Sequence, residues 1–362
     1  MTDEQEQWRR VRGYLNENRY ALTQQLLGAD GELPLLTRPH WVPVQPVPLE
    51  RVRLRWEADA PAAAIDGRDG VGSGLYSDAV RNLARPRLFE NRVCYRLLEV
   101  AEGEPSLTFG RGRYFDVIDI CEAVAHEYAA AVLAGKPGDT PFRDAIADPT
   151  DLARRPVMAA VTTLTIRHDR RTGEAEFLLH WRDPAKVATG GGLYQVMPCG
   201  MFQPSHDAPW NEGNDFDLWR AILRELNEEL LGGSEDYGSG NSPIDYADWP
   251  LNEELSEARE DGRLRLFWLG LGMDPLTYVT DLLTVAVFDA DLFDATFRLL
   301  VTTNDEGHRV ALDDATGRSA GIPFTAAHVD RFTTAEPMQP AGAALLRLAW
   351  QHRDTLLPPE SK

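Results

Sequence analysis

The stretch that decides the fold runs from Trp219 to Gly232 and reads WRAILRELNEELLG. Its apolar side chains recur every four residues and would share one stripe of a helix: Leu218, Ile222, Leu226 and Leu230. Asn214 or Asp215 is expected to cap the start of this helix, because short polar side chains accept from its first free amides. Gly232 and Gly233 are expected to end it, because glycine readily takes the left-handed cap conformation. The stretch therefore predicts an amphipathic helix with one buried face.

Three glutamates fall on the polar side of the same helix: Glu225, Glu228 and Glu229. Residues three or four apart on a helix are neighbours, so these carboxylates repel one another. A hard divalent cation relieves that repulsion, and Mg²⁺ is typically held by one or two carboxylates together with waters and substrate phosphates. The spacing therefore indicates a metal site, and the competing interpretation is an acidic helix surface that is simply solvated.

A Pro198-Cys199-Gly200 loop precedes the helix and follows two strand-like runs. Loop and helix together resemble the Nudix box, the motif of hydrolases that cleave a diphosphate linked to a nucleoside or similar group. The family pattern is Gly, five residues, Glu, seven residues, then Arg-Glu-apolar-any-Glu-Glu-any-Gly-apolar. Residues Arg224 to Glu229 fit its helical core position by position, and Gly200 fits its start.

The resemblance implies a Nudix-like α/β/α sandwich in the second half of the chain. It also implies that Glu228 and Glu229, supported by Glu225, hold Mg²⁺ or Mn²⁺. Arg224 would orient the carboxylates by ion pairing, so Arg224 and Glu225 are predicted catalytic residues. A carboxylate from a later loop often completes such sites, and Glu306 is the candidate; its alternative is an ordinary Asx-type turn.

The sequence departs from the family pattern in three places. His206 stands where the family has glutamate, an inserted stretch separates the Gly200 loop from the helix, and the closing glycine, Gly232, comes one residue late. The insertion ends in Asp215-Phe216-Asp217. We therefore expect Asp215 or Asp217 to cap the helix and to replace the missing glutamate as partner of Arg224.

The remaining patterns predict an α+β protein with two domains, since 362 residues exceed what one core usually serves. Residues 1–155 are expected to form a smaller α+β domain and residues 156–362 the Nudix-like domain, with a proline-rich boundary at 135–156. The expected helices span 5–27, 117–133, 250–259 and 340–353. The expected strands span 52–56, the second half of 88–100, 106–109, 158–167, 175–181, 264–271 and 282–288.

One pair of polar residues inside the expected helix 117–133 has two interpretations. Glu122 and His126 are four residues apart and could ligate a metal, but such a pair more often makes a hydrogen bond on a helix surface. We prefer the second interpretation.

Composition excludes several classes of protein. A formal charge of −20 argues against binding DNA, because phosphate recognition needs clustered lysine and arginine. The three cysteines have unrelated spacings and form neither a disulfide framework nor a zinc motif. The acidic start Met1–Glu6 does not fit a signal peptide, and no apolar run is long enough for a membrane span. A cytoplasmic protein is expected.

The leading hypothesis is Mg²⁺-dependent hydrolysis of a nucleoside-diphosphate-type linkage in a small, nucleotide-like substrate. The second hypothesis is a degenerate Nudix domain that binds such a ligand and regulates a partner without turnover; His206 favours it. A third and weaker one is an interaction protein whose acidic surface docks a basic partner. A second copy of the chain, in a homodimer, is the macromolecular partner left open.

Overall fold

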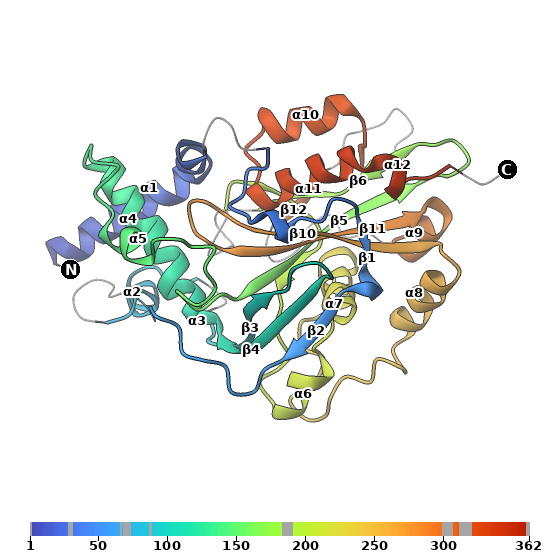
Figure 1. Cartoon of the computed structure of the whole chain (residues 1–362), viewed down its shortest axis with the longest axis horizontal. Helices are drawn as coiled ribbons and strands as arrows, with labels where there is room; N and C mark the ends of the chain where they lie inside the picture. The colour runs from blue at the N-terminus through green and yellow to red at the C-terminus, as the bar shows by residue number, and fades with distance from the viewer. Residues whose placement is uncertain are drawn as a thin grey trace.

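The computed structural model describes residues 2–27, 32–65, 67, 74–86, 89–182, 191–298, 307–310 and 321–359. Helices and strands are mixed along the chain, so the protein has an α+β fold, as predicted. Figure 1 shows a central sheet with helices on both sides and the two ends of the chain at opposite ends of the long axis. Within the described residues, every helix is too short or too polar to cross a lipid bilayer.

The central sheet has seven strands in the order β1-β10-β11-β5-β6-β13, and β9 also pairs with β5. Their bounds are β1 Val47–Pro48, β5 Ala159–His168, β6 Ala175–Phe177, β9 Cys199–Met201, β10 Leu264–Met273, β11 Thr280–Asp289 and β13 Ile322–Pro323. Strands β5 and β11 run parallel, with Thr280 opposite Ala159, while β10 and β9 run antiparallel to their neighbours β11 and β5. The centre of the sheet is therefore two long, buried strands.

Helices cover both faces of this sheet. On one face lie α7 (Leu218–Leu231), α8 (Pro250–Glu260) and α9 (Ala290–Thr296); on the other lie α11 (Pro340–Gln351) and, beyond it, α10 (Ala326–Thr334) (Figure 1). Alternation along β11 explains the division, because successive side chains of a strand point to opposite faces. Leu282 and Phe288 belong to the core under α7, and Leu283 and Val287 to the core under α11.

Two smaller sheets flank the central one. The first has the order β12-β7-β8, with β7 Leu179–Arg182, β8 Tyr194–Val196 and β12 Gly307–Val310. The second has the order β2-β4-β3, with β2 Arg53–Trp56, β3 Val93–Val100 and β4 Ser106–Arg113. Tyr95 and Phe109 of the second sheet make tilted and edge-to-face contacts with Phe202, which follows β9, and Phe216, which precedes α7. This aromatic cluster joins the first half of the chain to the core under α7.

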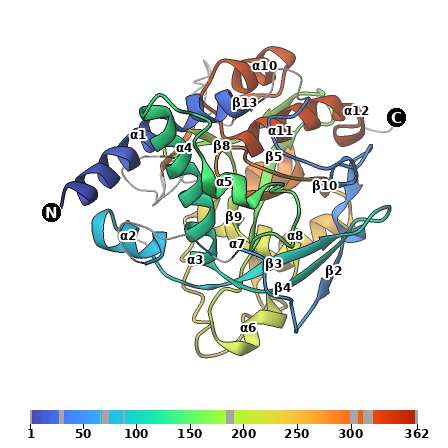
Figure 2. The same ribbon diagram turned by 60° about the vertical axis from the view of Figure 1, so that its left-hand side comes forward.

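The remaining helices lie mainly at one end of the molecule. They are α1 Asp3–Leu26, α2 Tyr76–Leu83, α3 Tyr114–Val117, a π-helical turn Ile118–Glu122, α4 Ala123–Leu133 and α5 Pro141–Ile146, with α6 Pro209–Asn214 and α12 Arg353–Leu356 elsewhere. Short 3-10 turns span Pro39–Trp41 and Leu49–Arg51. Figure 2 shows α1 lying beside α4, away from the central sheet.

A buried ion cluster fastens α1 to α4. The carboxylate of Glu122 receives hydrogen bonds from Arg12 and, at 2.6 Å, from Arg19, and its side chain is 1% exposed. His126 instead contacts the Tyr76 hydroxyl, at 2.9 Å from Nδ1, and stacks on Trp8. The expected surface hydrogen bond between Glu122 and His126 is therefore wrong, because each side chain has its own buried partners.

Two predicted strands differ in extent. The strand expected at 106–109 continues to Arg113 through Gly110, where a methyl group would lie 2.6 Å from Ala60 Cβ. That glycine marks a close approach of two chain segments rather than the end of a strand. The strand expected at 175–181 divides at Leu178, because its first part pairs with β5 and its second part pairs with β8.

The predicted boundary after residue 155 remains a prediction. The apolar core under α7 contains Leu97 and Leu107 together with Leu226 and Leu266, and β1 pairs with β10. Arg155 itself is buried and donates to the carbonyl of Tyr278 at 2.6 Å. The two halves of the chain therefore share one continuous apolar core.

Candidate functional site

Helix α7 forms as its sequence predicts, and its caps are now identified. The Asp217 carboxylate accepts the backbone N–H of Arg220 at 2.9 Å, so Asp217 is the N-cap. Gly232 ends the helix in the left-handed conformation, with φ of 70°. The expectation of Asp215 or Asp217 as the cap is therefore confirmed for Asp217. The expectation of Asn214 or Asp215 is wrong, because Asn214 ends α6 and Asp215 lies in the turn between the two helices.

Glu225 lies directly on the strand that contains Gly200. A methyl group built on Gly200 would lie 1.9 Å from Oε1 and 2.3 Å from Oε2 of Glu225. Any side chain larger than hydrogen at position 200 would have to displace this carboxylate. The structure thus brings together two positions of the predicted motif that are separated by the whole insertion.

Glu229 also faces β9. Its Oε1 accepts the backbone N–H of Cys199 at 2.8 Å, and the residue is 7% exposed. Burial of a carboxylate is costly unless its oxygens are bonded, so this hydrogen bond holds Glu229 in place. One oxygen of a predicted metal ligand is therefore already engaged by the protein backbone.

Glu228 points toward Tyr237 instead. The Tyr237 hydroxyl donates to Glu228 Oε1 at 2.8 Å. Burial raises the pKa of Glu228 from 4.5 to about 7, while the Tyr237 hydrogen bond and the nearby Arg224 and Arg92 oppose the rise. Burial, followed by the charge of Glu228, raises the pKa of the Tyr237 hydroxyl.

The predicted metal ligands do not form a three-ligand cage. Across the residues that the structure describes, no group of three or more His, Cys, Asp and Glu side chains is placed to hold a metal ion. Glu225, beside β9, and Glu228, beside Tyr237, nevertheless offer two half-buried carboxylates three residues apart on α7. That donor set fits Mg²⁺, which commonly takes one or two protein carboxylates and completes its shell with waters and phosphates.

Arg224 is fixed by the partner predicted to replace the missing glutamate. Its Nη1 lies 3.8 Å from Asp215 Oδ1 and donates to the Tyr246 hydroxyl at 2.6 Å; that hydroxyl in turn donates to Asp215 at 2.9 Å. The Arg224 Nη2 donates to the carbonyl of Gln203 at 2.8 Å. The expectation that Asp215 or Asp217 pairs with Arg224 is confirmed for Asp215. Tyr246, which bridges the pair, could not be selected from the sequence.

His206, where the sequence departs from the predicted motif, is exposed and lies in the loop that precedes α6. Its Nδ1 accepts the backbone N–H of Ala208 at 3.0 Å, and its ring packs on Gly240, where a methyl group would lie 3.2 Å away. The loop that carries His206 is held by Asp215, whose Oδ2 accepts from the backbone and hydroxyl of Ser205 at 2.7 and 2.6 Å. Glu306 lies outside the described residues.

A second buried polar group adjoins β9 on the other face of the sheet. Thr162 Oγ1 donates to Asp281 Oδ1 at 2.6 Å and lies 3.2 Å from the sulfur of Cys199. Burial raises the pKa of Asp281 from 3.8 to about 7; Asp274 adds to the rise, and Arg182 opposes it. The only signal of this group in the sequence is an aspartate near the start of a largely apolar strand, opposite a second strand that is rich in threonine.

Comparison of the sequence with known protein families found no matching family, and comparison with curated proteins found no match.

Proposed function

We propose that this chain is a Nudix-type hydrolase that cleaves a diphosphate linkage in a small, nucleotide-like substrate with the help of Mg²⁺ or Mn²⁺. The observation that carries the proposal is the contact between Glu225 and Gly200, which joins the loop and the helix of the predicted box. The three-layer arrangement of helices around the mixed sheet supports the same family.

The chain's own residues have distinct tasks in this proposal. Glu225 and Glu228 would hold the metal ion, which supplies charge neutralisation of the phosphates and a polarised water when bound. Glu229 would support the metal site and, through the hydrogen bond that it accepts from the Cys199 backbone N–H, would fix the position of β9 beside it. Arg224, locked by Asp215 and Tyr246, would keep the helix in register so that the carboxylates face the substrate.

A cytoplasmic location is part of this proposal. Cys94, Cys121 and Cys199 are all free thiols. Free cysteines without disulfides are typical of reducing compartments.

A degenerate Nudix domain that binds without turnover is the second candidate. Two observations favour it: the described residues offer no three-ligand metal group, and Glu229 already accepts a backbone hydrogen bond. In this alternative the same surface binds a nucleotide-like ligand, and the chain reports ligand binding to another protein.

Product release distinguishes the two candidates. The purified chain is incubated with dinucleotides, nucleotide sugars and nucleoside triphosphates, with Mg²⁺ or Mn²⁺, beside Glu225→Gln and Glu253→Gln variants. Glu253 is an exposed glutamate on α8 and serves as the matched control. Turnover by wild type and Glu253→Gln, and loss in Glu225→Gln, supports the hydrolase. If a ligand raises the melting temperature of the chain but neither wild type nor the variants release product from it, the non-catalytic binding domain is supported.

A further inference from the structure

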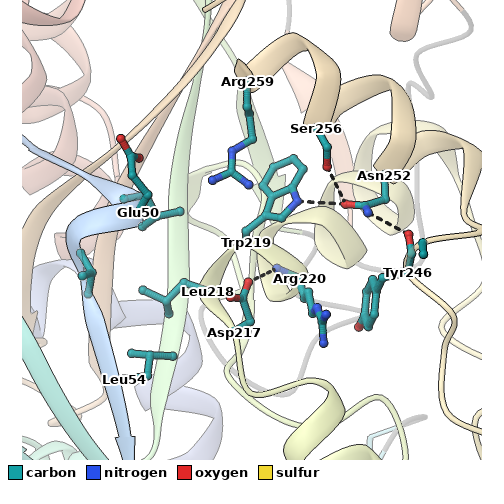
Figure 3. Close-up of a pocket in the computed structure, with 13 residues that line it drawn as sticks. Glu50, Leu54, Asp217, Leu218, Trp219, Arg220, Tyr246, Asn252, Ser256 and Arg259 are labelled. Atoms are coloured by element: carbon teal, nitrogen blue, oxygen red, sulfur yellow. Dashed lines mark hydrogen bonds between the residues drawn. The ribbon is translucent and has the colours of Figure 1, made fainter. Parts of the chain in front are cut away.

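A cavity of about 550 Å³ opens beside the first turn of α7, between that helix, α8 and the segment from Leu49 to Leu54 (Figure 3). Trp219, on its wall, and Glu225 lie on the same helix about 9 Å apart along its axis, given a rise of about 1.5 Å per residue, and neither Glu225 nor Gly200 lines the cavity. The cavity is therefore separate from the contact between Glu225 and Gly200. Its volume falls within the range of about 300–1,000 Å³ that is typical of small-molecule sites.

Arg259 reaches from α8 into this cavity, and Figure 3 shows its guanidinium between Trp219 and the wall that carries Glu50. The guanidinium carbon lies 4.8 Å from the centroid of the Trp219 ring. The indole N–H is already used, because it donates to Asn252 Oδ1 at 3.0 Å. The contact with the Trp219 ring therefore orients the Arg259 guanidinium without occupying the N–H groups of that guanidinium.

The charge of Arg259 is only partly balanced by the protein. Burial lowers its pKa, while Asp217 and Glu50 oppose that effect from a distance. Asp217 is engaged as the cap of α7, and no carboxylate of the described residues is within ion-pair distance of Arg259. An arginine that is held against an aromatic ring presents its N–H fork to a carboxylate or phosphate at a reduced entropic cost.

The rest of the cavity is suited to an amphipathic molecule. Arg220 adds a second cation, with its guanidinium 4.6 Å from the centroid of the Tyr246 ring. Leu54 and Leu218 form an apolar wall opposite α8 (Figure 3). Glu50 and Asp217 at the edge would repel further negative charge, so the site disfavours a polyphosphate.

We propose that this cavity binds a small organic anion that has one carboxylate or phosphate group and an apolar body. The anionic group pairs with Arg259, and the apolar body packs on Leu54 and Leu218. Such a site is distinct from the proposed diphosphate site and does not depend on it.

The test is calorimetric binding to the full chain, in a chelator so that no metal site contributes. The probes are 1-naphthoate, 1-naphthyl phosphate and the neutral 1-naphthamide. We expect at least one of the two anions to bind at one site per chain. The anion that binds more tightly identifies the preferred anionic group, carboxylate or phosphate. We expect Arg259→Gln to weaken that binding by about tenfold or more, as for loss of a charged hydrogen bond. Arg263→Gln should leave it unchanged, since Arg263 is exposed and pairs with Asp261.

Leu54→Trp provides a second variant that fills the cavity without altering charge, and it should also abolish binding. Melting temperatures of both variants confirm that they are folded. Three results would each overturn the proposal. The first is equal binding of 1-naphthamide and the anions, and the second is unchanged binding by folded Arg259→Gln and Leu54→Trp. The third is absence of binding by wild type at millimolar probe.

Discussion

The carboxylate of Glu225 on α7 lies so close to the α-carbon of Gly200 on β9 that a methyl group there would be 1.9 Å from Oε1. This contact joins Gly200, the last residue of the Pro198-Cys199-Gly200 loop, to the middle of α7. It accounts for a glycine at position 200, where backbone flexibility is not required but space is.

Gly200→Ala should be destabilising by about 1 kcal/mol or less, because the added methyl group must displace the Glu225 carboxylate, which is the far end of a flexible side chain. Glu225→Ala in the same chain should recover much of that loss, since it removes the group that clashes. Chemical denaturation of the two single variants and the double variant measures the coupling. Gly213→Ala is the control, because nothing lies within 4 Å of a methyl group at Gly213. If the changes in the free energy of unfolding caused by Gly200→Ala and Glu225→Ala simply add in the double variant, the two positions do not interact.

The buried partner of Arg224 leads to a second prediction. Asp215→Ala should cost about 3–5 kcal/mol, because it leaves the arginine buried without its counter-charge. Tyr246→Phe should cost about 1–3 kcal/mol, since it removes the hydroxyl that joins the pair. His206→Ala, at the position where the family has glutamate, should change the stability by less than about 0.5 kcal/mol because the side chain is exposed. A larger loss for His206→Ala than for Asp215→Ala, measured by urea unfolding, would contradict this assignment.

The raised pKa of Asp281 predicts a pH dependence of stability. The folded protein keeps this carboxyl protonated to about pH 7, whereas the unfolded chain releases the proton near pH 3.8. The contribution of Asp281 to stability is thus present at low pH and is lost as the pH rises from 3.8 through about 7. Asp281→Asn should remove this dependence and raise the free energy of unfolding at pH 8 by about 1–3 kcal/mol. Denaturation curves at pH 5 and pH 8 test the prediction, and an equal difference between the two proteins at both pH values would refute it.

Glu122 predicts the opposite dependence in acid. Although burial alone would raise its pKa, Arg19 and Arg12 lower the value from 4.5 to about 2. Its contribution to stability is therefore present above pH 4.5 and is lost as the pH falls from 4.5 toward about 2. Glu122→Gln should destabilise the chain at pH 7 by about 3–5 kcal/mol, because two buried arginines lose their partner. Hydrogen exchange should then show early loss of protection in α1, and unchanged protection of α1 would contradict the ion cluster as its anchor.

The periodic elements were predictable from the sequence, because their burial follows simple spacing. The stripe of Leu218, Ile222, Leu226 and Leu230 faces the core as expected, and all four are buried. The pairing of Arg224 with Asp215 was also predictable, since the missing glutamate left a buried cation that needed a carboxylate. The first prediction depends on local spacing, and the second depends on one unsatisfied charge.

Features that depend on long-range contacts could not be predicted. Tyr246 and Tyr237 reach α7 from a loop that has no periodicity, and neither tyrosine is marked by its neighbours. Gly110 resembled a strand end because the approach of Ala60 is not visible along the chain. The directions of Glu228 and Glu229 also depended on tertiary partners, Tyr237 and the Cys199 amide, rather than on helical spacing.

The most direct test of the central proposal is turnover by wild type and by Glu229→Gln on the same panel of diphosphate substrates. Glutamine retains an oxygen that can accept the Cys199 amide, so the fold and the melting temperature should be preserved. The account predicts product release by wild type with Mg²⁺ or Mn²⁺ and a loss of about 10²-fold or more in the variant, as is common when one element of electrostatic catalysis is removed. An inert wild type across the panel, or a variant as active as wild type, would contradict it.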